Sequence, residues 1–334
     1  MNDRITEIWA MLGKHRKPAE GIERIRYAAE SPAALYLGFK TPEMFPAFSL
    51  SVPRKYLKRS LSGTVYRNLR LDYTADEINK DHVFINLLLT RPELAEIFDI
   101  LVGDFIARLE IVTDQQIQAT MFLDHLNKWQ ALFDNISGEQ LSEEAQRGLF
   151  GELTFLKKWI DHSADAGTCI TGWLGPDKEV HDFKTGMTAV EVKTTVTTSH
   201  PKLQISNERQ LDDNRLDQLF IFHAALEPRL SAGKTLPDII LEIQENIAHQ
   251  PALAAAFSAK LALSGYFLHH SEHYSGRGYF IRSAGYYHVI DTFPRIVERD
   301  IMPGIGDVKY TVAVSILAPF LVNEETVFNK LLQI

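Results

Sequence analysis

The stretch from Glu179 to Lys193 constrains the fold more than any other part of the chain, because two short segments there place charged side chains in a regular pattern. The segments read as two strands joined by a tight turn. Strand side chains alternate between two faces, so a residue and its second neighbour share a face roughly 7 Å apart. Glu191 and Lys193 therefore lie on one face and Val192 on the other. Asp182, on the first strand, is expected alongside Glu191 across the hairpin.

Two carboxylates and an ammonium at one end of a small sheet suit a hard divalent cation. Mg²⁺ takes oxygen ligands, usually one or two carboxylates together with water and substrate phosphate. A lysine beside the cation can stabilise developing negative charge or help to deprotonate the attacking water, which is the chemistry that phosphodiester hydrolysis needs. The alternative is a solvent-facing edge strand with an ordinary cross-strand charge pair.

A helix predicted from Ser142 to about residue 160 comes just before this hairpin. Glu152 lies beside its core stripe, which is formed by Leu149, Leu153, Leu156 and Ile160. A carboxylate on the packed side of this helix is a candidate member of the site. The commoner alternative is a glutamate at the edge of the stripe with its head group in water.

The segment after Lys193 predicts a strand over 203–206, a short helix with Asn207 as its N-cap, and an apolar strand over 218–226. The sequence therefore predicts a strand, a helix and a second strand, in that order, after the charged hairpin.

Asp182 followed by Glu191-Val192-Lys193 resembles the PD-(D/E)XK nuclease motif, with His181 where the name of the motif has Pro. A wider series is similar to a bacterial PD-(D/E)XK family long known as a domain of unknown function. That series comprises Gly148-Leu-Phe-Gly-Glu152, His181-Asp-Phe, Glu191-Val-Lys and Gln204-Ile-Ser-Asn-Glu-Arg-Gln-Leu, with Trp129 and Phe293-Pro-Arg295 also fitting.

The resemblance covers most of the chain and implies a restriction-endonuclease-like fold with a place in restriction-modification or related phage defence. It also implies that Glu152 lies near the metal and that Gln204 faces the site. For Gln204, a position on the outer face of its strand is an equally good interpretation.

A length of 334 residues predicts two domains, or one domain with a sizeable appendage. We expect an α/β fold, α+β overall, with a restriction-endonuclease-like core whose mixed central sheet is flanked by helices. The predicted parts are an N-terminal α+β module (1–135), the nuclease core (136–228) and a C-terminal α/β extension packed on the core (229–334).

A local basic surface is predicted between residues 44 and 71, where no acidic residue occurs although the whole chain has a net charge of −8. Its cations are Arg54, Lys55, Lys58, Arg59, Arg67 and Arg70, interleaved with Tyr56 and Tyr66. Such a patch is a candidate DNA-phosphate surface. The alternative is a solvated loop and hairpin whose charges pair with acidic neighbours.

Composition restricts the remaining classes. The net charge argues against a protein that coats nucleic acid nonspecifically. A single cysteine, Cys169, excludes an internal disulfide and fits a reducing compartment. No apolar stretch is long enough to span a bilayer, so we expect a cytoplasmic protein with no membrane partner.

The function predicted from these observations is a metal-dependent DNA endonuclease. Asp182, Glu191 and the backbone carbonyl of Val192 would hold Mg²⁺, or Mn²⁺ in its place, and Lys193 would orient or activate the water. DNA is the expected partner, and a homodimer or restriction-modification subunits are further expected partners. The alternative is a catalytically silent subunit of the same fold that binds DNA or a partner protein. A small-molecule hydrolase lacks support, because no nucleophile elbow or Cys/His pair is present.

Overall fold

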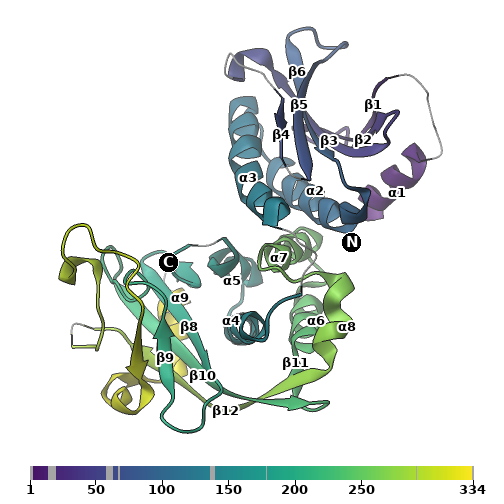
Figure 1. The fold of residues 1–334 in the computed structure, drawn as a ribbon. Coiled ribbons are helices and arrows are strands. Elements are labelled where there is room, and N and C mark those ends of the chain that lie inside the picture. Colours follow the sequence, from purple (N-terminus) through teal and green to yellow (C-terminus); the bar gives the residue numbers. More distant parts are fainter. Residues whose placement is uncertain are drawn as a thin grey trace. The chain divides into compact units, whose positions relative to one another are not determined.

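The computed structural model describes residues 3–13, 20–57, 63–66, 68–135, 140–177, 179–290 and 292–332. The chain divides into two compact units, of which the first comprises Met1–Glu139 with Gln250–Gly265 and the second Gln140–His249 with Tyr266–Ile334. Each unit has its own sheet (Figure 1). This grouping differs from the three predicted parts chiefly in residues 250–265, which the sequence places in the C-terminal extension.

The first unit is an antiparallel sheet with helices on one face. Its sheet has the order β1-β2-β3-β6-β5-β4, and Phe48 of β3 packs against Phe105 and Phe122 of the two long helices. The elements are α1 (Asp3–Leu12), β1 (Gly21–Arg26), β2 (Ala34–Thr41), β3 (Phe45–Pro53), β4 (Thr64–Val65), β5 (Leu69–Ala75), β6 (His82–Leu89), α2 (Ala95–Leu109), α3 (Gln115–Asn135) and α7 (Pro251–Leu263).

The helix α7 joins this unit although it follows the second unit's helices in sequence. It packs against α2. Its sequence is rich in alanine and apolar on nearly every side, and Phe257 and Leu261 are buried. A helix of this kind needs partners around its circumference.

The second unit contains the mixed sheet that the sequence predicts, in the order β11-β12-β10-β8-β7 with β14 also on β12. Strands β8 and β10 run parallel, whereas β7 and β12 run antiparallel to their neighbours. The elements are α4 (Glu143–His162), α5 (Ala166–Gly172), β7 (Phe183–Thr185), β8 (Thr188–Thr195), β9 (Lys202–Ile205), β10 (Gln218–Leu230), β11 (Lys234–Thr235), α6 (Leu236–Ile247), α8 (Ser271–Ser275), β12 (Arg277–His288), β13 (Tyr310–Ala313), β14 (Leu321–Val322) and α9 (Glu324–Leu332).

The two faces of this sheet are covered differently. The helix α4 lies on one face (Figure 1), and its Phe155 packs against Phe183 and Phe222. On the other face, Ala189 and Ile221 belong to a buried cluster that includes Ile205 of β9 and Val312 of β13. The predicted α/β core, α+β overall, is therefore confirmed.

Strand β9 pairs with β13 in a separate two-stranded sheet. The expectation of a short helix after Asn207 is wrong, because these residues form a series of turns. The Asn207 side chain accepts the N–H groups of Arg209 and Gln210, as the N-cap of a helix would, but the turns do not continue as a helix. Glu208 is likewise engaged, because its carboxylate accepts the Val308 N–H (2.9 Å).

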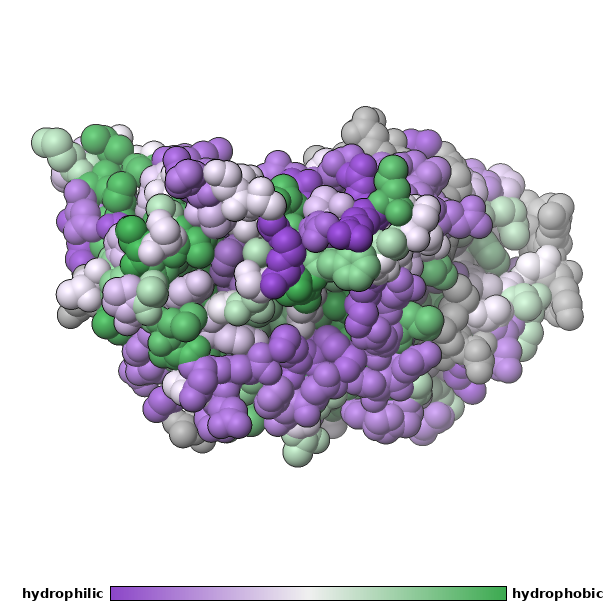
Figure 2. Space-filling model, turned by 90° about the horizontal axis from the view of Figure 1, so that it is seen from below, coloured by the Kyte–Doolittle hydropathy of each residue, from purple (hydrophilic) through white to green (hydrophobic). Residues whose placement is uncertain are grey.

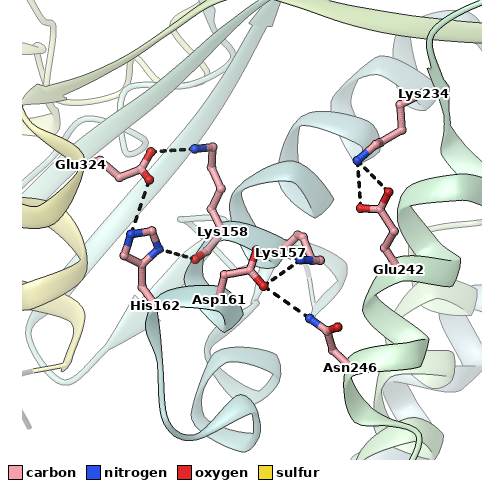
Figure 3. A network of polar contacts seen from close by, with 8 residues as sticks. All are labelled: Lys157, Lys158, Asp161, His162, Lys234, Glu242, Asn246 and Glu324. Carbon is pink, nitrogen blue, oxygen red and sulfur yellow. Dashed lines mark hydrogen bonds and ion pairs between the residues drawn. The ribbon is translucent and has the colours of Figure 1, made fainter.

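The helix α4 is fixed at both ends by polar side chains. Ser142 caps its first turn by accepting the Ala145 N–H (3.2 Å). In its last turns, Lys158 donates to Glu324 of α9 (2.7 Å), and the Tyr286 hydroxyl of β12 donates to the same carboxylate (2.6 Å). Figure 3 shows this end of the helix. These contacts hold in place the helix that carries Glu152.

The surface of the protein is largely polar where it is drawn. Hydrophilic residues cover most of the face in Figure 2, and the hydrophobic residues between them form small separate groups. Among the described residues, every individual helix is too short or too polar to cross a bilayer.

Candidate active site

The hairpin β7–β8 has the register that the sequence predicts. Phe183 pairs with Val190 and Thr185 with Thr188, around a turn in which Gly186 takes a positive φ of 54°. Because β7 contains only three residues, no strand in the described part of the chain pairs with the edge of β8 beyond Val190 on that side. Asp182 replaces the strand there, since the Val192 N–H donates to Asp182 Oδ2 (2.7 Å).

The backbone carbonyl of Val192 is directed to the same edge. In an antiparallel ladder the N–H and C=O of one residue point to the same side, and this side alternates along the strand. Thr188 and Val190 face β7 through these groups, and Val192 lies two residues further on. The bond from the Val192 N–H to Asp182 agrees with this alternation. A carbonyl oxygen and the Asp182 carboxylate thus border the same open edge.

The side chains of Glu191 and Lys193 lie on one face of β8 and that of Val192 on the other, as predicted from the period of two. Glu191 is buried, with 1% of its surface exposed, and its Oε1 accepts from Lys193 Nζ (2.7 Å). Its Oε2 is also buried and has no hydrogen-bond partner among the described residues. Burial, and secondarily the Asp182 carboxylate, raise the pKa of Glu191 to about 8, although Lys193 opposes the shift.

Glu152 reaches the same region from α4. The helix approaches β8 closely at Gly151, where a side chain would collide with Thr194. Trp173 lies in the loop after α5 and donates its indole N–H to Glu152 Oε2 (2.7 Å). Burial and the Asp182 carboxylate raise the pKa of Glu152 well above its usual range, and the Trp173 bond only partly offsets this.

Gly175 shows how near Glu152 and Asp182 lie to each other. A methyl group on Gly175 would come within 2.5 Å of Glu152 Oε2 and 3.3 Å of Asp182 Oδ1. The loop is held there because the N–H groups of Leu174 and Gly175 both donate to the Asp182 carbonyl (2.7 and 3.1 Å). Burial also raises the pKa of Asp182, against the effect of Lys193. The structure therefore brings Asp182, Glu191, Lys193 and Glu152 together.

Gln204 is not brought into contact with these groups. Its side chain is exposed on β9, opposite Thr311 of β13. The amide that reaches Lys193 belongs instead to Gln210, whose Oε1 accepts from Lys193 Nζ (3.0 Å). The role predicted for Gln204 remains a prediction.

Three residues of the site were missed by the sequence interpretation, namely Trp173, Gly175 and Gln210. Gln210 lies six residues after Gln204, in a segment predicted to be a short helix. Trp173 and Gly175 lie in a stretch rich in turn residues. The only sequence feature that could have indicated a role for Trp173 and Gly175 is the presence of an indole and two glycines just before a charged hairpin.

The predicted basic surface belongs to the first unit. Arg54 and Lys55 are exposed, and Arg70 forms an ion pair with Asp72 (2.8 Å), which is the pairing that the alternative interpretation expects. Lys58, Arg59 and Arg67 lie outside the described residues. DNA contact by this surface remains a prediction.

The donor set at the site fits a hard divalent cation. Three carboxylates converge on one ammonium, the buried Glu191 Oε2 lacks a hydrogen-bond partner among described residues, and a carbonyl oxygen borders the same edge. No group of three His, Cys, Asp or Glu side chains in the described ranges forms a ready-made metal cage. Mg²⁺ commonly uses one or two carboxylates with water and phosphate rather than a complete protein cage. The lack of a ready-made cage among the described residues is therefore compatible with a Mg²⁺ site here.

Comparison with known proteins places the chain in a family. No curated protein and no solved structure matches it. A family model described as "Putative PD-(D/E)XK family member, (DUF4420)" matches residues 5–315. This match includes both units and every residue of the site. The chain therefore belongs to this PD-(D/E)XK family, as the order Asp182, Glu191, Lys193 predicts.

Proposed function

We propose that the protein is a metal-dependent nuclease that hydrolyses phosphodiester bonds in DNA. The observation that carries this proposal is the convergence of Asp182, Glu191 and Glu152 on the single ammonium of Lys193. Membership of a PD-(D/E)XK family supports a nuclease-like activity. A site with a surplus of buried carboxylates destabilises the folded protein unless a cation completes it.

Asp182, Glu191 and the Val192 carbonyl would hold Mg²⁺ or Mn²⁺. When bound, such a cation neutralises the carboxylates and polarises the phosphate. Lys193 provides a positive charge beside the reacting phosphate, and its hydrogen bonds favour the more negative transition state. Trp173 orients Glu152 toward the site through its indole N–H.

The proposal extends to a defence role, in restriction-modification or against phage. DNA is the substrate in this proposal, and a homodimer would place one site on each strand of a duplex. The basic residues Arg54 and Lys55 would contribute phosphate contacts.

A plasmid assay tests the proposal. Supercoiled DNA, methylated and unmethylated, is incubated with the protein in Mg²⁺, Mn²⁺ or EDTA, beside Asp182→Ala and Lys193→Ala. We expect cleavage that needs the cation and disappears in both variants. Cleavage that persists in Lys193→Ala would exclude this site as its source. Absence of cleavage by the wild type, together with normal DNA binding, would favour the catalytically silent subunit.

A further inference from the structure

Gln210 connects the site to a part of the chain that has no other role in the proposed chemistry. Its side-chain oxygen accepts two hydrogen bonds, from Lys193 Nζ (3.0 Å) and from the Ser206 N–H (2.9 Å). An amide oxygen has two acceptor positions, and both are used here. If the amide were turned over, its NH₂ group would face two donors. The oxygen is therefore held toward Lys193.

The segment that carries Gln210 is itself anchored on several sides. Asn207 Oδ1 accepts the Gln210 N–H (3.2 Å), and Leu211 is fully buried in the cluster beneath the sheet. Arg295 donates to the Leu211 carbonyl and to Asp213 Oδ2 (both 2.8 Å). A turn held by this many contacts presents a fixed acceptor rather than a mobile one.

A fixed second acceptor matters because Lys193 and Glu191 lie on the same face of β8. In the structure the ammonium occupies Glu191 Oε1, which is one of the oxygens expected to serve a cation. If Glu191 were the only acceptor, Lys193 and the cation would compete for the same carboxylate. The Gln210 oxygen can keep the ammonium in place without adding another negative charge.

We propose that Gln210 is a positioning residue that holds the Lys193 ammonium beside Glu191 and leaves that carboxylate available to a divalent cation. The proposal deepens the proposed function and rests on it for its catalytic meaning. The contact between Gln210 and Lys193 can nevertheless be tested in protein that contains no cation.

The first measurement is the acetylation of lysines by acetic anhydride in EDTA, read by mass spectrometry. Labelling of Lys193 is expressed relative to Lys158, which pairs with Glu324 in the same molecule. Loss of one hydrogen bond from a charged group frees the amine, so Gln210→Leu should raise this ratio by about tenfold. Gln210→Glu retains an acceptor oxygen and should leave Lys193 at least as protected as in the wild type.

The second measurement is single-turnover cleavage in Mg²⁺ at saturating DNA, with DNA affinity measured separately in EDTA. Gln210→Leu should lower the rate constant about 10- to 100-fold, because partners behind a metal site affect activity by this much. DNA affinity should stay unchanged, and Gln210→Glu should restore part of the rate. A general loss of folding would instead lower affinity and rate together.

The two glutamines give opposite predictions. If Gln204→Leu, and not Gln210→Leu, lowered the rate, the sequence-based assignment of Gln204 would stand and the present proposal would fall. An unchanged labelling ratio in Gln210→Leu would also overturn it. If the wild type cleaved no DNA, the proposed function would fail separately, while the labelling ratio would still decide whether Gln210 holds Lys193.

Discussion

Two groups of charged side chains involve residues of α4, and they differ in their balance of charge. Near the middle of the helix, Glu152 meets Asp182 and Glu191 around the one ammonium of Lys193. Near its end, the Glu324 carboxylate accepts a hydrogen bond from Lys158 and lies 3.6 Å from His162 Nε2 (Figure 3). The Tyr286 hydroxyl donates to the same carboxylate. The first group has a surplus of negative charge, whereas the second is balanced.

The pKa shifts of the two groups have opposite directions for this reason. Burial raises the pKa of Glu152 and of Glu191, and the neighbouring Asp182 adds to both shifts. Burial acts on Glu324 too, but the bonds from Lys158 and Tyr286 outweigh it and the pKa is lowered. The comparison teaches that a carboxylate held for stability is given its partners by the fold. Under the proposed function, the carboxylates that serve chemistry are the ones left short of partners.

The same isosteric substitution in the two groups should therefore give different results. Glu152→Gln keeps an acceptor for Trp173 but removes the charge, and we expect cleavage to fall by about 100-fold. Glu324→Gln should leave the cleavage rate within about twofold, since a change far from the reacting atoms has little effect on the transition state. Initial rates on supercoiled plasmid in Mg²⁺ measure both.

Equal losses in the two variants would break the comparison, because they would show that α4 acts as one structural unit without a distinct site. Circular dichroism of each variant is the control for folding. If only Glu324→Gln lost activity, the site would have to be sought at the other end of the helix.

A smaller effect on cleavage is expected from the loop that approaches both carboxylates. Gly175→Ala would place a methyl group 2.5 Å from Glu152 Oε2, so either the loop or the carboxylate must move. A displacement of this kind should lower the cleavage rate by about tenfold, since misplacing catalytic groups is costly. Gly276→Ala is the matched control, because a side chain there meets no atom within 4 Å and its φ of −74° suits alanine. Wild-type activity in Gly175→Ala would mean that Glu152 does not need its observed position.

The charge-balanced group around Glu324 should contribute to the stability of the fold. Glu324→Gln removes the charge that holds Lys158 and the buried Tyr286. Because Lys158 and Glu324 both retain contact with solvent, the expected loss is about 1 to 2 kcal/mol. Hydrogen exchange of peptides from α4 and α9, followed by mass spectrometry, should show faster exchange at the C-terminal end of α4 and in α9. Unchanged exchange would show that the network contributes nothing measurable.

Much of the fold could be predicted because local patterns and the core agree. The alternation of β8 gave the shared face of Glu191 and Lys193, and the apolar stripe of α4 gave the position of Glu152. Strand β7 was placed correctly because its turn contains Gly186. These features depend on neighbours in sequence, so the sequence alone carries them.

The remaining features depend on contacts between distant segments. Strand β9 pairs with β13, about a hundred residues later, and no local pattern indicates this choice of partner. Gln210 reaches Lys193 because the turn after Asn207 is anchored by Glu208 and Arg295. The helix α7 joins the first unit through α2. For β9 and α7 the sequence pattern identifies the element but not its neighbour, and for the segment of Gln210 it identifies neither.

The smallest effect expected is a gain of stability from weakening the charge surplus. The folded-state pKa of Glu191, about 8, lies above the ordinary value of 4.5. Protonation of Glu191 therefore stabilises the fold fully below pH 4.5, and this contribution is lost as the pH rises through 8. The glutamine in Glu191→Gln does not ionise, so in EDTA this variant does not lose the contribution as the pH rises. Its stability relative to the wild type should therefore increase with pH. The gain should be greatest at pH 9 and should vanish at pH 4.5.

Thermal unfolding between pH 4.5 and 9 measures this difference, and Glu324→Gln is the control with the opposite sign. Since the pKa of Glu324 is lowered, its contribution is present above the ordinary value and is lost only as the solution becomes more acidic. The deficit of Glu324→Gln should therefore stay nearly constant between pH 4.5 and 9 and shrink only in more acidic solution. A stability difference that grows with pH for Glu191→Gln, beside a constant deficit for Glu324→Gln, would distinguish the two groups without any assay of activity. Parallel curves would mean that the buried carboxylates are already compensated by the protein, and a cation would then have little to neutralise.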